Sequence, residues 1–343
     1  MDPAVSVIVC TFNRARSIKS TIRSLLAQAL SDSYEIIVVD NGPTNDTFSV
    51  VKGFQQKART PLLYVHETEQ GLSRARNRGL RSARGDIVAF IDDDARADPA
   101  WLATLTATFR SSENVAAVGG RIKPARLEKL PSWLPRRLIS HLSLLDYGKD
   151  VINLRYPNYP FGTNMAFRRS VFEEVGLFDP SLGRSGTTSF QTGEETDLFS
   201  RIELAGKSVY YNPSAVVYHI IHPQRLRPVW FYHQTYWIGF SSGVIEKRYK
   251  PAIYVKLNVL LSAVIIGAGC SCWGLTRLLN HQVLDVFARC AIHNRCGYIR
   301  GVLDEWLQDH SARRVTEPRR PARQQILCRI ADPNKINRGH KMN

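Results

Sequence analysis

Ile87-Val-Ala-Phe-Ile91, followed directly by Asp92-Asp93-Asp94, is the stretch that decides the fold and points to the chemistry. Its apolar part is rich in β-branched and aromatic side chains, which predicts a buried strand. Carboxylates this close together repel one another unless a positive charge lies among them. A hard divalent cation bound through oxygen is the natural partner, and Mg²⁺ or Mn²⁺ in such a site usually also holds substrate phosphates. The alternative is a solvated acidic turn before a helix, because Asp98-Pro99 has the pattern of an N-cap followed by proline.

Strands and helices are expected to alternate in the N-terminal part of the chain. Apolar, β-rich segments predict strands at 5–10, 34–39, 62–65 and 87–91, and apolar periodicity predicts helices at 14–30, 45–59 and 71–83. This alternation is typical of an α/β fold with an open, mostly parallel sheet flanked by helices. Ligands of such sheets bind beyond the carboxyl ends of the strands. Polar residues follow three of these ends, at 11–13, 40–41 and 92–94, which predicts one polar crevice.

The residues that follow are less regular. Strands are expected at 115–120 and 161–167, with a loop-rich segment at 121–160 between them. A helix is expected to open at Gly193, and two short strands are expected within 208–218. The chain contains no Gly-x-Gly-x-x-Gly after its first strand and no Gly-x-x-x-x-Gly-Lys-Ser/Thr. These absences speak against a nicotinamide or flavin Rossmann domain and a P-loop NTPase, so a nucleotide would have to be held by Asp40 and a metal ion.

Composition is compatible with several kinds of partner. The 343 residues suffice for one large domain or two ordinary ones, and 44% of them are hydrophobic, enough for a real core. The formal charge of +16 is uneven, because basic residues outnumber acidic ones thirteen to six from residue 277 onward. Such an excess suits nucleic acid, anionic lipid headgroups or anionic substrates. Six cysteines show neither a zinc-ribbon nor a disulfide-framework spacing, and no cleavable signal is visible, so we expect reduced thiols in a cytosolic compartment.

Six motifs between about residues 4 and 225 resemble those of the inverting family 2 glycosyltransferases with a GT-A fold. Each motif alone is modest, but the six together in the family's order are specific. They are Val5-Ser-Val-Ile-Val-Cys-Thr-Phe-Asn-Arg14, Glu35-Ile-Ile-Val-Val-Asp-Asn41, Gly71-Leu-Ser-Arg-Ala-Arg-Asn-Arg-Gly79, Phe90-Ile-Asp-Asp-Asp94, Gly162-Thr-Asn-Met-Ala-Phe-Arg-Arg169 and Gly193-Glu-Glu-Thr-Asp-Leu198. The resemblance implies a hexosyltransferase-type enzyme that uses a nucleoside-diphosphate sugar, with a UDP-sugar expected from family frequency.

The resemblance implies that several of these positions bind the donor and the acceptor. Thr11 and Asp40 match the pair that holds the base and the ribose, although Asp40 also suits a turn after a strand. The positions that would line the nucleotide pocket are Arg74, Arg76 and Asn77. The positions that would line the sugar or acceptor pocket are Gly162, Thr163 and Asn164. For the two arginines, a place on a helix surface is the alternative.

The fourth motif matches the family's Asp-x-Asp pattern. By resemblance Asp94 is the direct metal ligand, Asp92 reaches the ribose or a metal-bound water, and Asp93 is the ambiguous middle residue. The metal would stabilise the leaving nucleoside diphosphate as charge develops on it. Many members of the family complete the metal or diphosphate shell with a histidine after the last strand. His219 is therefore a candidate and His222 a weaker one, with a purely structural histidine as the alternative.

The sixth motif is expected to supply the general base. Where the family often carries Glu-Asp, this chain has Glu194-Glu195, so that Glu195 is one methylene longer than the usual base and Glu194 or Asp197 stays an alternative. One carboxylate within reach of an acceptor hydroxyl suits a single displacement at the anomeric carbon, whereas a double-displacement glycosidase needs two that flank the bond. First-turn acidic residues that complement a helix dipole are the other possibility.

The C-terminal third has a composition that suits a membrane. Residues 230–240 are dense in aromatic side chains, which favour a membrane interface or a docking helix. Residues 257–275 carry no formal charge between Lys256 and Arg277 and are barely long enough to span a bilayer. Because both flanks are basic, we expect both on the cytosolic side, with a re-entrant or interfacial segment hinged at Gly267-Ala-Gly269. Two short spans, with 282–303 returning, and a buried core helix are the alternatives.

The sequence therefore predicts a catalytic domain at 1–225, a helical membrane-associated region at 226–310 and a basic disordered tail at 311–343. The leading hypothesis is a metal-dependent, membrane-associated glycosyltransferase that extends a lipid-linked or polysaccharide acceptor, with its catalytic domain in the cytoplasm. One alternative is a transferase for a soluble acceptor, with the apolar segment as an oligomer interface. A non-enzymatic nucleic-acid-binding protein is suggested only by the charge and lacks a recognisable binding motif. A catalytically inactive relative is the last alternative.

Overall fold

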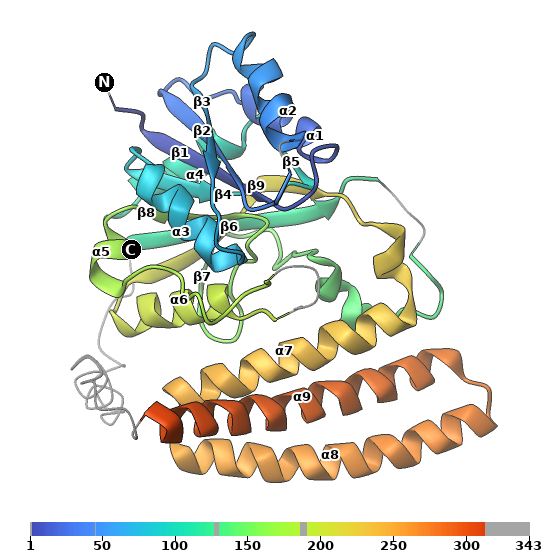
Figure 1. Cartoon of the computed structure of the whole chain (residues 1–343). Coiled ribbons are helices and arrows are strands. Elements are labelled where there is room, and N and C mark those ends of the chain that lie inside the picture. The colour runs from blue at the N-terminus through green and yellow to red at the C-terminus, as the bar shows by residue number, and fades with distance from the viewer. Residues whose placement is uncertain (1, 45, 127–129, 186–190, 313–343) are drawn as a thin grey trace. The chain divides into compact units, whose positions relative to one another are not determined.

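The computed structural model describes residues 2–44, 46–126, 130–185 and 191–312 (Figure 1). The chain divides into two units, residues 1–303 and residues 304–343. The second unit is described only by its residues 304–312, which are the last turns of a helix. The disordered tail is predicted for residues 311–343. Residues 311 and 312 are the last two of this helix, and residues 313–343 lie outside the described residues.

A mixed β-sheet forms the framework of the N-terminal part. The strands lie in the order β3-β2-β1-β4-β8-β6-β9-β5, and β7 pairs with β9. Neighbours from β3 to β4 are parallel, and β8 is antiparallel to both β4 and β6. The strands are β1 (Val5–Thr11), β2 (Tyr34–Asp40), β3 (Leu62–His66), β4 (Ile87–Phe90), β5 (Ala95–Ala97), β6 (Val115–Pro124), β7 (Ile152–Leu154), β8 (Met165–Arg168) and β9 (Ser208–His219).

Helices cover both faces of this sheet. One core cluster joins strand side chains such as Val7 and Val9 to α1, α2 and α4, and a second joins Ile8 and its neighbours to α3, α5 and α6. Alternate residues of β1 thus point into opposite cores, which is why the strand is apolar along nearly its whole length. The helices of this part are α1 (Ile18–Leu26), α2 (Asp46–Gln55), α3 (Leu72–Ser82), α4 (Trp101–Arg110), the 3₁₀ helix η1 (Arg136–Leu142), α5 (Val171–Val175), α6 (Glu194–Leu204) and the 3₁₀ helix η2 (Pro223–Leu226).

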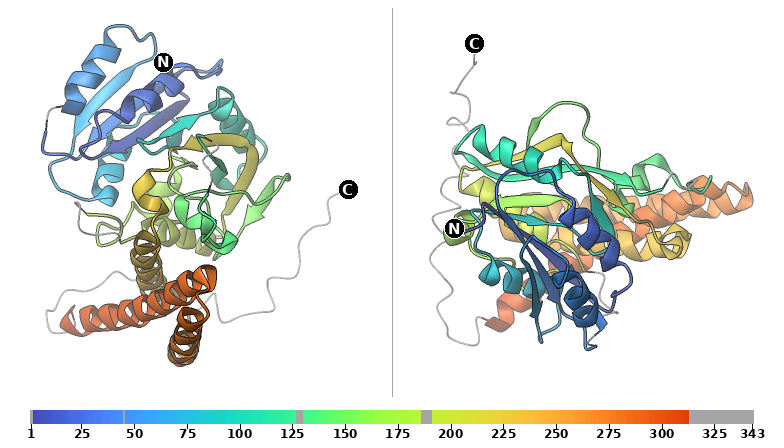
Figure 2. Two further views of the ribbon diagram at one scale, coloured as in Figure 1. Left: turned by 90° about the vertical axis from the view of Figure 1, so that its right-hand side faces the viewer. Right: turned by 90° about the horizontal axis from the view of Figure 1, so that it is seen from above.

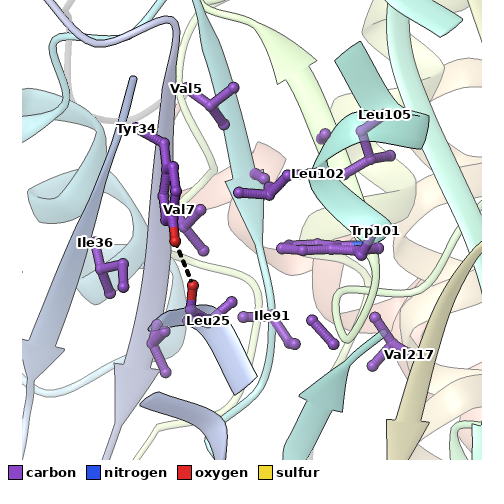
Figure 3. Close-up of a cluster of buried hydrophobic side chains, with 14 of the residues drawn as sticks. Val5, Val7, Leu25, Tyr34, Ile36, Ile91, Trp101, Leu102, Leu105 and Val217 are labelled. Carbon is purple, nitrogen blue, oxygen red and sulfur yellow. Dashed lines mark hydrogen bonds between the residues drawn. The ribbon is translucent and has the colours of Figure 1, made fainter. Parts of the chain in front are cut away.

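Trp101 sits at the centre of the first core cluster (Figure 3). Its ring is fully buried beside Leu102 and Leu105 of the same helix. The indole Nε1 donates a 2.8 Å hydrogen bond to Asn164 Oδ1, so that the one polar atom of the ring is satisfied. At the edge of the cluster Tyr34 donates its hydroxyl to the Leu25 carbonyl, a bond that ties β2 to the end of α1. The sheet and its helices are therefore held by close side-chain packing with few polar interruptions.

The strands and helices predicted for residues 5–91 are confirmed, with ends that differ by a few residues. The two short strands predicted within 208–218 are wrong, because β9 is one strand. Pro213 lies within this strand, and the pairing of β6 with β9 shifts there from Gly120↔Asn212 to Ile122↔Val217. A bulge of this kind accommodates a residue without a backbone N–H and lets the strand continue. In the alternative interpretation Asp98 caps the next helix; α4 instead begins at Trp101 with Ala100 as N-cap, and Asp98 Oδ1 accepts a 3.1 Å hydrogen bond from the Ala100 amide just before the helix.

Three long helices follow the sheet: α7 (Pro228–Tyr249), α8 (Ala252–Leu278) and α9 (Gln282–Ala312). Figure 1 and the left view of Figure 2 show α8 on the side of this group that faces away from the strands. Of the described helices, α8 alone is long and apolar enough to cross a membrane, and only 11% of its apolar window is buried. The predicted hinge at Gly267-Ala-Gly269 is wrong, because α8 runs unbroken through it. A Cβ on Gly269 would lie 2.8 Å from the Ile292 side chain, so this glycine allows α8 to approach α9 closely.

Candidate active site

A cavity of about 840 Å³ opens beyond the carboxyl ends of β1, β2 and β4. All three polar strand ends contribute to its wall, through residues 11–14, Asn41 and Asp92 to Asp94. Other parts of the wall come from the first turns of α3 and α6, the loop before β8, the end of η1, residues 156–157, Arg184, Arg225 and one face of α7. The parallel strands bring these segments together because their carboxyl ends meet at the same edge of the sheet.

Asp93 is held inside the protein by two donors from the end of β1. Thr11 Oγ1 donates to Asp93 Oδ2 at 2.6 Å, and Arg14 Nη1 lies 3.1 Å from Asp93 Oδ1. Burial and the neighbouring Asp94 carboxylate raise the pKa of Asp93 to about 7, against the opposing effect of Arg14. Asp93 therefore connects the first and fourth sequence motifs. In the described structure the Thr11 hydroxyl, which was predicted to bind the nucleotide, is hydrogen-bonded to Asp93.

Asp94 is surrounded by groups that carry or can acquire positive charge. The four groups are Arg14 Nη1 at 2.9 Å, His219 Nε2 at 3.3 Å, His222 Nε2 at 3.4 Å and Arg225 Nη2 at 3.5 Å. Burial opposes ionisation, but hydrogen bonding by His219 and His222 and the charge of Arg225 hold the pKa of Asp94 well below its usual range. Asp94 is thus a buried, ionised carboxylate in a strongly positive surrounding.

Asp92, Asp94 and His219 form a cluster suited to a divalent metal ion. One ligand atom from each lies within 4.8 Å of the others. The pairing of β5 with β9 sets Ala95 opposite His219 and so carries the histidine next to Asp94. Two carboxylates and one imidazole match the preferences of Mn²⁺ and related ions. Asp92 also accepts a 2.5 Å hydrogen bond from Thr163 Oγ1, which fixes the carboxylate at the cavity wall.

Glu194 and Glu195 open α6 and share one buried arginine. Arg76 Nη1 lies 2.9 Å from Glu194 Oε1, and Arg76 Nη2 lies 2.8 Å from Glu195 Oε1. The side chains of Arg76 and Glu194 are nearly inaccessible, whereas Glu195 is 24% exposed and lines the cavity. Burial, which is the largest effect, raises the pKa of Glu195 to about 7. The positive charge of Arg76 lowers this pKa, and the negative charge of Glu194 raises it. Gly162 packs against the ion pair of Arg76 and Glu195, because a Cβ at this position would overlap both side chains.

Four of the residues predicted to bind the donor or the acceptor lie outside the described wall of the cavity, as do the predicted Asp197, His219 and His222. Asp40 accepts hydrogen bonds from the Tyr64 hydroxyl and the Gly42 amide, both at 3.0 Å. Arg74 is paired with Glu69 at the surface. Asn77 exchanges hydrogen bonds with the Phe178 backbone, and Asn164 binds the Ala215 carbonyl in addition to Trp101. Asn77 and Asn164 thus have a structural role: they fix the backbone at Phe178 and at Ala215.

Asp197, the third carboxylate of the α6 motif, has partners of its own. Its Oδ2 lies 2.9 Å from Arg201, and its Oδ1 accepts a 2.7 Å hydrogen bond from the Tyr249 hydroxyl. It is buried away from the described cavity wall. Of the three acidic residues, Glu195 is the one with an accessible carboxylate at the cavity.

Several residues of the cavity were not expected from the sequence. Arg14 is the last residue of the first motif. Its position three residues after Thr11, beyond the same strand end, could have identified it as a cavity residue. Arg225 and the α7 residues Gln234, Ile238 and Ser241 follow the last motif, and nothing in their local sequence marks them. The chain folds back so that α7 closes the cavity, a contact between segments far apart in sequence.

Known proteins are similar to this chain in sequence and in architecture. Residues 6–176 match the family described as Glycosyl transferase family 2. The chain is 31% identical over 252 residues to the glucosyl-dolichyl phosphate glucuronosyltransferase of Haloferax volcanii, covering 72% of this chain and 79% of the relative. It is 28% identical over 320 residues to the succinoglycan biosynthesis protein ExoM of Rhizobium meliloti, covering 91% and 97%.

A solved structure confirms the fold. The mannosyltransferase PcManGT from Pyrobaculum calidifontis, in complex with GDP-Man and Mn²⁺, matches with a TM-score of 0.61 at 20% identity, over 89% of this chain and 88% of that one. The expected GT-A architecture, a mixed sheet flanked by helices, is therefore confirmed. Together with the family match and the relative from Haloferax volcanii, these findings show that the chain is a glycosyltransferase and belongs to glycosyl transferase family 2.

Proposed function

We propose that the protein transfers a sugar, with inversion, from a nucleoside-diphosphate sugar to a saccharide acceptor carried by a lipid or a growing polysaccharide. One observation carries the proposal: the cluster of Asp92, Asp94 and His219 and the accessible Glu195 belong to the same site at the strand ends. The printed names of the relatives support the acceptor class, since one acts on a dolichyl phosphate sugar and the other belongs to succinoglycan biosynthesis.

The donor nucleotide would lie over the carboxyl ends of β1 and β2. Thr11 and Asn41 at the wall and Asp40 just behind it would contact the base and ribose, and each would exchange a present hydrogen bond within the protein for one to the donor. The donor diphosphate would replace Asp94 as the partner of Arg14 and Arg225, because phosphate and guanidinium pair strongly. UDP is the nucleotide that we expect, from the family resemblance.

Asp92, Asp94 and His219 would hold Mn²⁺, or Mg²⁺ in its place. The imidazole favours Mn²⁺, because Mg²⁺ prefers oxygen ligands and strict octahedral geometry. The metal when bound supplies positive charge for the leaving diphosphate. His219 Nε2 faces Asp94 Oδ1 and Arg225 Nη1, both at 3.3 Å, so it is the ring nitrogen placed to bind the metal ion, whereas Nδ1 is buried without a hydrogen-bond partner in the described part of the chain.

Glu195 would act as the general base. Its Oε accepts the proton of the acceptor hydroxyl while the hydroxyl oxygen forms the new bond to the anomeric carbon and the bond to the diphosphate breaks. Attack from the side opposite the leaving group inverts the configuration. Arg76 would hold the Glu195 carboxylate in place, and Glu194 would balance the charge of this buried guanidinium.

Residues 1–225 would form the catalytic domain on the cytoplasmic side, and residues 226–310 would attach it to the membrane. The outward face of α8 supports this attachment, since it exposes large apolar side chains in a helical stripe. Members of the stripe are Ile253, Leu257, Leu260, Leu261, Val264, Leu275 and Leu278. A face of this size in water is unfavourable unless lipid or protein covers it. Attachment would bring the catalytic domain to a lipid-borne acceptor.

Titration calorimetry of the full chain in detergent micelles tests the donor half of the proposal. A panel of UDP-, GDP- and dTDP-sugars is titrated with and without Mn²⁺ into wild type and Asp94→Asn. We expect one nucleotide class to bind in a metal-dependent way, and Asp94→Asn to lose that dependence. Asp86→Asn, which removes a carboxylate that is 93% exposed, is the matched control and should bind as wild type does. Folded wild type that binds no member of the panel would contradict the proposal.

A further inference from the structure

One face of α7 forms a wall of the active-site cavity. The α7 residues in this wall follow a helical spacing of four, three, one and three residues, so they lie on a single stripe. They are Gln234, Ile238, Ser241, Ser242 and Ile245. This stripe mixes a carboxamide, two hydroxyls and two apolar side chains, a combination that suits the polar groups and the apolar ring faces of a saccharide.

The opposite side of α7 is fixed to α9 by reciprocal glycines. On α7, a Cβ at Gly239 would overlap the Asn294 carbonyl and one at Gly243 would overlap the Tyr298 carbonyl. On α9, a Cβ at Gly297 or Gly301 would overlap the α7 backbone in the same way. Each helix thus carries a Gly-x-x-x-Gly motif through which the two backbones touch. The wall is therefore rigid, as a binding surface needs to be.

The α7 wall also contacts the segment that leads into the proposed base. Ser241 Oγ donates to the Thr192 carbonyl at 2.6 Å, and a Cβ on Gly193 would lie 3.0 Å from the Ser241 Cβ. A general base must lie within hydrogen-bond reach of the hydroxyl that it deprotonates. The acceptor therefore approaches on the side of Glu195, which is the side that α7 closes.

Gln234 has an unsatisfied acceptor atom in this wall. The residue is 6% exposed, and its Oε1 is buried with no hydrogen-bond partner in the described part of the chain. Gln234 precedes Ser241 by two helical turns, about 10 Å along the axis. The other polar residues of the wall at this end come from η1 and the residue after it: Ser140, His141 and Ser143. Native proteins rarely leave a buried carbonyl oxygen unpaired, so such an atom needs an explanation.

We propose that Gln234 recognises the acceptor: its carboxamide, buried in the wall of the free protein, turns toward the cavity, and Oε1 accepts a hydrogen bond from a hydroxyl group of the acceptor saccharide, one or two rings from the hydroxyl that reacts at Glu195. The proposal rests on the proposed glycosyl transfer and adds the position at which the enzyme distinguishes acceptors. Gln234 would then set acceptor affinity and leave the nucleotide site and the free protein's stability untouched.

The test compares Gln234→Met with wild type, using the full chain in detergent micelles with Mn²⁺ and UDP present. Methionine keeps the length of the side chain and removes the carbonyl oxygen. The probes are methyl glycosides of disaccharides and trisaccharides built from glucose, galactose, mannose or N-acetylglucosamine, which are long enough to place one ring at Glu195 and another at Gln234. Their binding is measured by saturation-transfer NMR and titration. Gln282→Met, at an exposed site on α9, is the matched control. Thermal unfolding without ligand and calorimetric titration of the donor panel are measured on all three proteins.

We expect at least one glycoside to bind wild type and Gln282→Met equally, and Gln234→Met at least tenfold more weakly. Donor affinity and the unfolding temperature of Gln234→Met should stay at the wild-type values, because the removed atom has no partner in the free chain. Equal glycoside binding by Gln234→Met, or no binding by wild type that binds donor normally, would overturn the proposal. A lowered unfolding temperature would make Gln234 structural, and weakened donor binding alone would place it on the donor side. Wild type that binds no donor would instead contradict the proposed function.

Discussion

The buried guanidinium of Arg76 pairs with Glu195 at the cavity surface, with Nη2 2.8 Å from Oε1, and it also binds the buried Glu194 at 2.9 Å. One positive charge therefore faces two carboxylates in a site where burial already opposes ionisation. Arg76 lowers the pKa of Glu195 and Glu194 raises it, with burial as the largest effect and a resulting pKa of about 7. The ionisation of the proposed base is thus set by two neighbours of opposite sign.

The pH profile of transfer should report this balance. Because Glu195 must lose its proton to act as base, kcat/KM should rise with pH through about 7 and level off above it. Glu194→Gln removes a negative neighbour and should move this limb to lower pH, whereas Arg76→Met removes a positive neighbour and should move it to higher pH. Glu195→Gln should lose about 10²- to 10⁴-fold in kcat on the high-pH plateau, and its profile should lack the limb near pH 7.

One variant and one further measurement act as controls for that profile. Glu69→Gln removes an exposed carboxylate from a surface pair and should leave the limb in place. Thermal unfolding of each variant separates a shifted limb from loss of structure, since Arg76 is buried. A limb that stays near pH 7 in both Glu194→Gln and folded Arg76→Met would assign the base to another group.

Metal affinity should depend on His219 more than on His222. The His219 ring is buried and belongs to the cluster with Asp92 and Asp94, whereas the His222 side chain is 35% exposed. We expect His219→Ala to weaken Mn²⁺ binding by at least tenfold and His222→Ala to weaken it less, measured by Mn²⁺ electron paramagnetic resonance. His233→Ala, at an exposed position of α7, should bind Mn²⁺ as wild type does. Equal Mn²⁺ affinity of wild type and His219→Ala would remove His219 from the site.

The glycines between α7 and α9 should be intolerant of even one methyl group. Gly239→Ala and Gly243→Ala would each place a Cβ against a backbone carbonyl of α9, so we expect the free energy of unfolding to fall by about 1–3 kcal/mol. The matched controls are Gly267→Ala and Gly274→Ala on α8, where a Cβ meets nothing within 4 Å. These should be neutral or stabilise by up to about 1 kcal/mol, because alanine is the better helix former. Chemical denaturation in one detergent measures all four, and equal effects in both pairs would exclude a close helix contact.

The exposed stripe of α8 should bind membranes. Leu260 and Val264 are 65% and 67% exposed, and replacing both with lysine should reduce binding to vesicles of phosphatidylcholine and phosphatidylglycerol at least tenfold in sedimentation assays. Phe48→Lys with Val151→Lys adds the same charge at exposed apolar sites of the sheet-bearing part and should bind as tightly as wild type. Unchanged vesicle binding together with dissociation of a wild-type oligomer would assign the stripe to a protein interface.

The sequence alone determined the parts of this protein that depend on local pattern. Strands such as Val5–Thr11 and Ile87–Phe90 are apolar because both faces of the sheet are buried, so their composition identifies them. The carboxylates after β4 and at the start of α6 stand at fixed positions relative to those elements, and the six motifs were enough for the family and the fold.

Only the tertiary structure decided which of these groups meet. His219 lies beside Asp94 because β5 pairs with β9, strands separated by more than a hundred residues. Arg76 is buried and pairs with two glutamates, whereas the next residue, Asn77, hydrogen-bonds to the backbone of Phe178. The spacing of the motif does not reveal this difference. The α7 wall exists because glycines on two helices let their backbones touch. Such contacts depend on the packing of segments distant in sequence, and local composition carries no information about their partners.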